Sequence, residues 1–128
     1  MKLAKKGVHL IITARTLGAL EDLSDKVLAA GSTVTVAPLD LCREKDFQIV
    51  ARTIYEKFGG IDILVHSASS AIPMTPIETI QKNEIINFFN NTFITQRVIQ
   101  MIDPLLKKNS NCLALFIQDN NEYRNKKF

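Results

Sequence analysis

The sequence predicts an α/β fold in which parallel strands are covered by helices on both sides. Short apolar runs rich in branched residues alternate with longer segments whose apolar residues recur every three or four positions. These two patterns are typical of buried strands and amphipathic helices. The strand-like runs are apolar on both faces, as parallel strands between two layers are. Their alternation with helices predicts a parallel sheet joined by right-handed crossovers.

The first half of the chain contains two predicted strands with one helix between them. Residues 8–14 form a mostly apolar run, and residues 33–37 form a second run, rich in β-branched side chains. Thr16 is placed to cap the helix, and Gly31 is placed to end it. The helix is predicted by apolar residues three or four positions apart, namely Leu17, Leu20, Leu23, Val27 and Leu28.

The second half begins with the clearest helix of the sequence. Gly59 and Gly60 close this helix, and residues 61–66 predict a third strand. The apolar residues of the helix fall on one stripe, which consists of Phe47, Val50, Ala51, Ile54, Tyr55 and Phe58. The remaining segments are a long helix, a fourth strand and a tail without apolar periodicity, at about residues 82–108, 113–117 and 118–128.

Length and charge narrow the class of protein. The 128 residues are enough for one domain, and no apolar run approaches the roughly 18 residues that span a bilayer. The formal net charge of +3 arises after residue 104, because residues 1–104 carry equal numbers of basic and acidic side chains. A basic tail is not a basic face that tracks a phosphate backbone. We therefore expect neither a membrane nor a nucleic-acid partner.

The two cysteines, Cys42 and Cys112, lie far apart, without a CxxC spacing or a nearby histidine partner. They predict neither a disulfide framework nor a zinc site, so no metal is expected. Reduced thiols of this kind are typical of a cytoplasmic protein.

Four segments together resemble the short-chain dehydrogenase/reductase family. They are LAKKGVHLIITAR at residues 3–15, LDL at 39–41, FGGIDILV at 58–65 and MIDPLL at 101–106. The family transfers hydride between NAD(P) and a carbonyl or alcohol. The resemblance implies an incomplete Rossmann-type doubly wound parallel sheet that lacks the first strand and the strands after residue 117. Residues 1–117 would form a partial NAD(P)-binding domain, truncated at both ends, and residues 118–128 a polar basic tail.

The resemblance implies cofactor-binding roles for Arg15 and Asp40. Arg15 follows the first predicted strand, where the family reads the adenosine ribose, and a cation there favours the 2′-phosphate of NADP over the free hydroxyls of NAD. Asp40 matches the aspartate that accepts a hydrogen bond from the adenine amino group. A solvated surface arginine and a turn residue after Pro38 are the alternatives.

Ala68 is the third position that the resemblance assigns to the cofactor. His66-Ser67-Ala68-Ser69 stands in place of the family's Asn-Asn-Ala-Gly at the nicotinamide side of the pocket, and only the alanine is retained. Ser69 adds a Cβ where glycine lets the backbone approach the cofactor. The imidazole of His66 suits a general base, with an unperturbed pKa near 6.5. We interpret it instead as a strand-end side chain satisfied by the backbone.

By the same resemblance, the catalytic positions fall on Asn91, Tyr123 and Lys127. Counting back from the end of the long helix aligns Asn91 with the asparagine of the family's catalytic tetrad, and Asn87 and Asn90 are close competitors. Tyr123 and Lys127 have the spacing of the Tyr-x-x-x-Lys motif, in which tyrosine passes a proton to the carbonyl oxygen. A chance pair in a polar tail is the alternative, because both residues follow the last strand too closely.

Two parts of the family's site are missing from these 128 residues. No Thr-Gly-x-x-x-Gly-x-Gly phosphate-binding turn occurs, and Gln118-Asp119 stands where the catalytic serine is expected. In the Rossmann order the missing first strand lies between the strands at residues 8–14 and 61–66. The remaining strands must therefore pair directly, receive that strand from another polypeptide, or fold poorly.

We therefore expect a short-chain dehydrogenase/reductase-like chain whose parent activity is NAD(P)-dependent oxidoreduction of a carbonyl or alcohol, and which is inactive alone. NADP is the expected cofactor, and NAD is the alternative. A second interpretation is a non-catalytic partner that binds a homologue or a complementary fragment through the helix at 82–108, which matches the helix through which family members commonly pair. A decayed gene product without function is the third.

Overall fold

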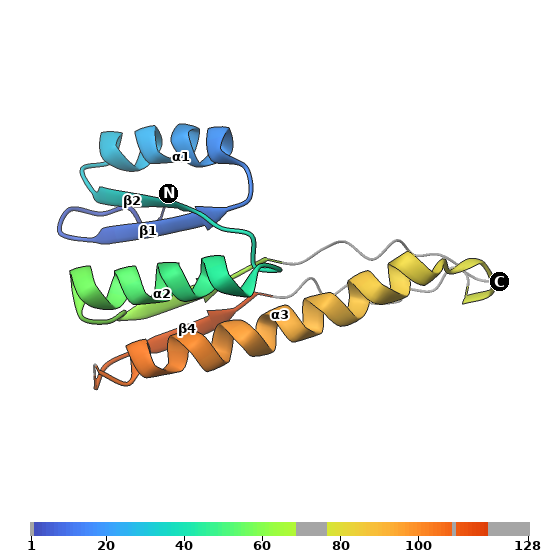
Figure 1. Cartoon of the computed structure of the whole chain (residues 1–128). Helices are drawn as coiled ribbons and strands as arrows, with labels where there is room; N and C mark the ends of the chain where they lie inside the picture. Colours follow the sequence, from blue (N-terminus) through green and yellow to red (C-terminus); the bar gives the residue numbers. More distant parts are fainter. Residues whose placement is uncertain (1, 69–76, 109, 118–128) are drawn as a thin grey trace. The chain divides into compact units, whose positions relative to one another are not determined.

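The computed structural model describes residues 2–68, 77–108 and 110–117 (Figure 1). The chain divides into two compact units, residues 1–53 and 54–128, and the boundary falls inside a helix. In chain order the elements are β1 (His9–Ala14), α1 (Leu17–Ala29), β2 (Thr33–Pro38), α2 (Glu44–Phe58), β3 (Ile63–His66), a 3-10 helix (Ile77–Thr79), α3 (Lys82–Leu106) and β4 (Leu113–Phe116).

The unit of residues 1–53 is built on the parallel pair β1–β2. The register places His9 opposite Thr33, and α1 packs against the pair (Figure 1). Leu20 and Val27 of α1 are 2% and 1% exposed. Burial of these two side chains, one above the other on the helix, holds α1 to the strands.

The two ends of α1 show what the sequence does and does not predict. Thr16 occupies the N-cap position with an extended backbone, but its side chain makes no capping hydrogen bond. The predicted cap is therefore right in position and wrong in its contact. Gly31 has a φ of 81°, a left-handed conformation that glycine adopts without steric cost at the end of a helix. The buried Ser32 then donates from Oγ to the carbonyl oxygen of Lys5 at 2.8 Å.

Helix α2 begins at Glu44, three residues before Phe47, the first residue of the predicted apolar stripe. Glu44 lies in its first turn, where the helix dipole stabilises a carboxylate. Phe47 and Ile54 are buried as the stripe indicates, whereas Tyr55 is 48% exposed. Gly59 ends the helix with a φ of 75°. The stripe is therefore only partly a core face.

The unit of residues 54–128 is built on the parallel pair β3–β4, in which Ile63 lies opposite Leu113. Helix α3 precedes β4 and begins after Gln81, whose backbone N–H donates to Glu84 Oε2 at 2.8 Å. This bond satisfies a backbone donor at the helix N-terminus that would otherwise have no partner. The helix ends at Leu106, two residues before its predicted end.

The turn between α2 and β3 lies against the last turn of α3. The backbone N–H of Ile61 donates to the carbonyl oxygen of Leu105 at 3.2 Å. A Cβ added at Gly60 would lie 2.7 Å from the same oxygen. A backbone carbonyl cannot move away as the end of a flexible side chain can. Glycine is therefore required at this position.

Each unit has its own group of buried apolar side chains. In residues 1–53 they are Ala4, Leu20, Val27, Leu39 and Phe47. In residues 54–128 they are Ile54, Val98, Ile102, Leu105 and Leu106. Most of the second group comes from the C-terminal part of α3, so this part of the helix provides the packing of that unit.

The described strands form two separate two-stranded parallel sheets. The predicted parallel α/β class is confirmed, and the incomplete sheet takes the form of two strand pairs. The described strands of each unit pair within that unit, so all three predicted consequences of the missing strand stay predictions. The assignment of residues 1–117 to one domain stays a prediction. The tail at 118–128 lies outside the described residues.

Candidate functional site

Arg15 and Asp40 follow the neighbouring carboxyl ends of β1 and β2. Arg15 comes directly after β1, and Asp40 comes two residues after β2. Ala14 lies opposite Pro38 in the register, and the backbone N–H of Leu39 donates to the carbonyl oxygen of Ala14 at 3.0 Å. Ligands of α/β proteins bind at the carboxyl ends of parallel strands. The fold therefore brings a guanidinium and a carboxylate to the edge of the sheet where a ligand would bind.

The two side chains differ in how far they are engaged. Arg15 is exposed. Asp40 accepts a hydrogen bond at Oδ1 from the backbone N–H of Cys42 at 3.0 Å, and its Oδ2 lies 3.9 Å from Nε of Arg43. Asp40 therefore closes its own turn, as expected of an aspartate in a turn after a proline. Its contact with adenine stays a prediction.

His66 is the last residue of β3 and the one titratable side chain at this strand end that is buried, with 8% exposure. Its Nε2 lies 3.5 Å from the hydroxyl of Thr95 on α3. The ring meets Phe116 of β4 edge-on, with 5.6 Å between ring centroids. Burial lowers the pKa of His66 from its usual value of 6.5.

The interpretation of His66 as satisfied by the backbone is wrong for the ring. Its hydrogen-bond partner is a side-chain hydroxyl, because α3 brings Thr95 to the end of β3. The backbone carbonyl of His66 does pair, and accepts from Ile117 N–H at 2.8 Å. Ser67 and Ala68 follow as exposed residues, and Ser69 lies outside the described residues.

The predicted catalytic residues cannot be compared with one another in space. Asn91 lies in α3, one turn before Thr95. Its side chain, and those of its competitors Asn87 and Asn90, lie outside what the structure describes. Tyr123 and Lys127 fall in the segment 118–128, which also lies outside the described residues. All three catalytic assignments stay predictions.

Among the described residues, a tyrosine and a lysine form a chemically distinctive pair that the sequence did not indicate. Lys108 donates from Nζ to the phenol oxygen of Tyr55 at 2.9 Å, and the ammonium lies 4.0 Å from the centre of the ring. The hydrogen bond from Lys108, and then its positive charge, lower the pKa of Tyr55. The two residues are far apart in sequence, and no spacing could have predicted the pair. It belongs to the segments before β3 and after α3, away from the strand end that carries His66.

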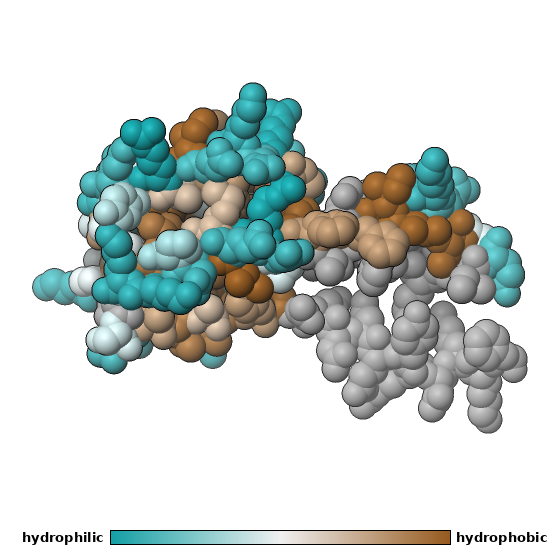
Figure 2. Space-filling model, turned by 60° about the horizontal axis from the view of Figure 1, so that its bottom comes forward, coloured by the Kyte–Doolittle hydropathy of each residue, from teal (hydrophilic) through white to brown (hydrophobic). Residues whose placement is uncertain are grey.

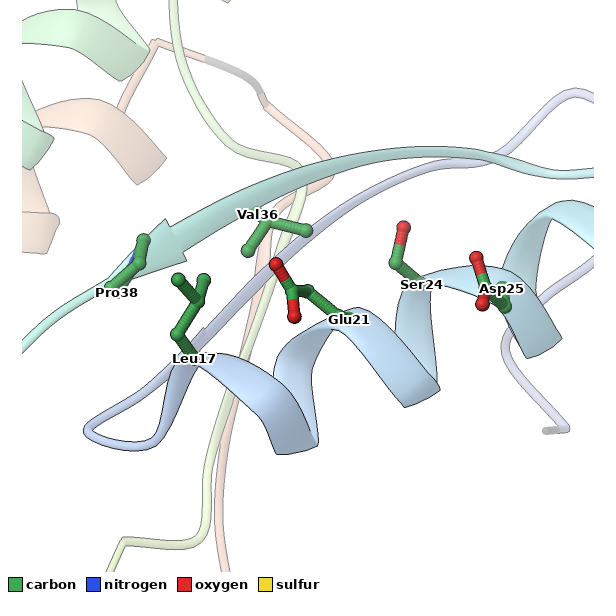
Figure 3. A pocket seen from close by; sticks show the side chains of 6 residues that line it. All are labelled: Leu17, Glu21, Ser24, Asp25, Val36 and Pro38. Atoms are coloured by element: carbon green, nitrogen blue, oxygen red, sulfur yellow. The ribbon is translucent and has the colours of Figure 1, made fainter.

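A groove of about 360 Å³ lies between α1 and β2 (Figure 3). Glu21, Ser24 and Asp25 contribute its polar side chains from the helix, and Leu17, Val36 and Pro38 contribute apolar ones. Two carboxylates act as an acid–base pair where burial or a close neighbour separates their pKa values, but Glu21 and Asp25 are both exposed. The groove is therefore not a candidate active site.

In the residues that the structure describes, no group of three or more His, Cys, Asp or Glu side chains is placed to hold a metal ion. None of the described helices combines the length and apolar character needed to cross a membrane.

The sequence of the two units matches a single family model, described as short chain dehydrogenase, over residues 1–120. The chain belongs to the short chain dehydrogenase family. The match covers nearly all of both units and confirms the resemblance drawn from the four sequence segments.

Two curated relatives of this chain are much longer than its 128 residues. Hydroxysteroid dehydrogenase-like protein 2 of Mus musculus is 31% identical over 115 residues, an alignment that covers 84% of this chain and 24% of that protein. Glycine betaine reductase ATRR of Emericella nidulans is 36% identical over 66 residues, which cover 52% of this chain and 5% of that protein. The chain thus spans about a quarter of the length of the first of these relatives.

Solved structures share the fold at lower identity. A metagenomic short-chain oxidoreductase in complex with NADP superposes with a TM-score of 0.79 at 18% identity, over 88% of this chain and 51% of that one. An alcohol dehydrogenase from the archaeon Thermococcus sibiricus, complexed with 5-hydroxy-NADP, gives 0.79 at 22% identity, over 89% and 48%. These likenesses confirm the Rossmann-type α/β fold.

Proposed function

We propose that this chain supplies part of the nucleotide-binding half of an oxidoreductase that uses NADP to interconvert a carbonyl and an alcohol. The observation that carries the proposal is the placement of Arg15 and Asp40 at adjacent carboxyl ends of β1 and β2. Family membership supports it, as do the two solved relatives that hold NADP or a derivative. NAD is the alternative cofactor.

Arg15 is the residue that selects the cofactor in this proposal. A guanidinium pairs with phosphate oxygens through two parallel hydrogen bonds, which a ribose hydroxyl cannot match. Asp40 accepts from the adenine amino group through Oδ2, which Arg43 approaches only to 3.9 Å, because Oδ1 already accepts from Cys42 N–H. Ala68, just after β3, leaves room for the nicotinamide side of the cofactor.

The chemical step is a hydride transfer that the nicotinamide supplies or accepts when bound. In the proposal Tyr123 passes a proton to the carbonyl oxygen, Lys127 lowers the pKa of that tyrosine, and Asn91 holds a water beside the lysine. The 128 residues contain no Thr-Gly-x-x-x-Gly-x-Gly turn for the pyrophosphate. We therefore propose that the 128 residues alone do not catalyse hydride transfer. We also propose that the protein is cytoplasmic, and that its ligand is a dinucleotide and not a nucleic acid.

The proposal is tested with the adenosine half of the cofactor, which does not need the pyrophosphate turn. Binding of 2′,5′-adenosine diphosphate and of adenosine 5′-monophosphate is followed by NMR titration of the 128-residue chain. We expect the 2′-phosphorylated ligand to bind more tightly, and Arg15→Ala to remove about tenfold of that preference, since hydrogen bonds to charged groups contribute about 1.5–3 kcal/mol.

Arg52→Ala is the matched control, because Arg52 is an exposed arginine inside α2 and does not follow a strand. This variant makes the same change in net charge and should leave the preference intact. Equal affinity for the two nucleotides, or an equal loss in both variants, would contradict the proposal. Loss of the preference for the 2′-phosphorylated nucleotide in Arg15→Ala alone would support NADP over NAD.

A second candidate function is that of a partner for another chain, and the surface of α3 favours it. Ile85, Phe89 and Phe93, spaced four residues apart, are 47%, 53% and 58% exposed. Such residues form one row along a helix. Figure 2 shows apolar side chains gathered over the N-terminal part of α3. We propose that this row pairs with a homologous or complementary short-chain dehydrogenase chain.

Sedimentation of the chain, alone and mixed with such a homologue, tests the pairing. We expect a complex that Phe93→Asp weakens and that Gln96→Asp, an equal change in charge three residues further on, leaves intact. A strictly monomeric species in both mixtures would count against the row as an interface.

A further inference from the structure

The side chain of His66 lies where three elements of its unit meet, namely β3, α3 and β4. It stands at the carboxyl end of β3, with Thr95 of α3 on one side and Phe116 of β4 on the other. Only 8% of the residue is exposed. The position of α3 relative to this strand end therefore depends on a side chain that can change its charge near neutral pH.

The surroundings of the ring suit neutral imidazole and do not suit imidazolium. A protonated ring presents two N–H donors and a positive charge, and the partner found among the described residues is a single hydroxyl at 3.5 Å. Among the described residues no carboxylate offsets the charge, and burial is the cause of the lowered pKa. Burying an uncompensated charge is far more costly than burying a neutral ring.

The charged groups of the neighbouring elements do not change this balance. β4 contributes no titratable side chain, and β3 contributes none besides His66 itself. On α3 the residue that touches the ring is Thr95, which is uncharged. The titratable side chains of these elements and of the described residues that flank them are Asp62, Lys82, Glu84, Arg97, Asp103, Lys107, Lys108 and Cys112. None of them contributes to the pKa of His66.

We propose that His66 is a proton-sensitive latch, which fastens the end of β3 to α3 and β4 when the ring is neutral and releases it when the ring is protonated. The proposal concerns the fold and stands whether or not the chain binds a nucleotide. Any effect of the latch on cofactor binding at Ser67 and Ala68, the two residues that follow His66, rests on the proposed function.

The direction of the pH effect follows from linkage. The folded chain holds the proton of His66 less tightly than the unfolded chain, whose histidine titrates near 6.5. The contribution of the latch to stability is therefore complete above pH 6.5. It falls as the pH drops below that value, with the unfolding equilibrium constant rising by at most about tenfold per pH unit.

NMR of the two histidine rings tests the latch. The chain contains only His9 and His66, so His9→Gln assigns both ring signals. We expect the His66 ring to titrate below 6.5, and the signals of Thr95 and Phe116 to shift with the same midpoint. In His66→Asn these two neighbours should not respond over the same pH range. Neighbours that do not follow the ring, or that respond equally in the variant, would overturn the proposal.

A second variant keeps the test decisive if His66→Asn does not fold. Thr95→Asp places a carboxylate beside the ring and should raise its midpoint, because an opposite charge within about 4–6 Å favours imidazolium. Gln96→Asp adds the same charge at the next, exposed position of α3 and should change the midpoint less. Equal midpoints in the two variants would show that the ring does not face Thr95 and would overturn the latch.

Discussion

The two strand pairs of this chain are both rich in apolar residues, but their side chains differ in burial. The strands of β1–β2 are largely half-buried, and α1 covers the pair with two side chains that are almost completely buried. In β3–β4, by contrast, every residue of β4 is exposed. Ile63 and Val65 are 54% and 39% exposed beside their register partners Leu113 and Leu115, at 49% and 44%. An apolar strand predicts that other residues pack on its faces. It does not predict that these residues come from the same stretch of the chain.

The largest expected change in the free energy of unfolding distinguishes the pair β1–β2, on which α1 packs, from the pair β3–β4. Leu20→Ala empties a position that is 2% exposed and should lower the free energy of unfolding by about 2–5 kcal/mol. Leu113→Ala, at a position 49% exposed, should change it by no more than about 0.5–1 kcal/mol. Urea unfolding followed by circular dichroism measures both. A large loss in Leu113→Ala would show that the face of β3–β4 is covered in solution.

The next effect concerns the turn that fixes α3 beside β3. Gly60→Ala forces a methyl group to within 2.7 Å of the Leu105 carbonyl oxygen and should lower the free energy of unfolding by about 1–3 kcal/mol. Gly18→Ala is the matched control in α1, where an added Cβ meets no atom within 4 Å. This control should be neutral or stabilising by up to about 1 kcal/mol. Equal destabilisation by both would mean that the close approach is absent.

The smallest effect is electrostatic and lies in the second unit. Lys108→Gln removes the hydrogen bond and the charge that lower the pKa of Tyr55, so that pKa should move back up toward 10. Lys107→Gln removes a neighbouring charge and should leave the phenol unchanged. Ultraviolet absorbance of the tyrosinate as the pH rises measures the difference. An identical titration in the two variants would exclude the contact.

The sequence predicted the helices, the strands and their parallel arrangement well, because apolar period and glycine punctuation are local signals. Gly31 and Gly59 end helices with positive φ as predicted, and parallel strands necessarily place Arg15 and Asp40 near one edge. What a side chain meets across space is not local. The half-exposed Tyr55 with its lysine, and the contact of His66 with Thr95, depend on helices that pack from distant parts of the chain.

The candidate site was predictable only where strand ends define it. Asp40 illustrates the limit, since its carboxylate closes its own turn and the same geometry suits both a turn residue and an adenine contact. The catalytic assignments depended on counting along the chain from distant landmarks. Counting gives order but not distance, so the roles of Asn91, Tyr123 and Lys127 stay predictions.

The pairing of the strands has a consequence for handling the molecule. Within the described part of each unit, each strand has one hydrogen-bonded neighbour, so inside its own unit it leaves one row of amide and carbonyl groups without a ladder. Such rows are templates on which strands of other molecules can add, and the exposed branched side chains of β3–β4 make addition more favourable. Concentrated samples of the polypeptide should therefore convert over time into fibrils that bind thioflavin T, and dilute samples should convert more slowly.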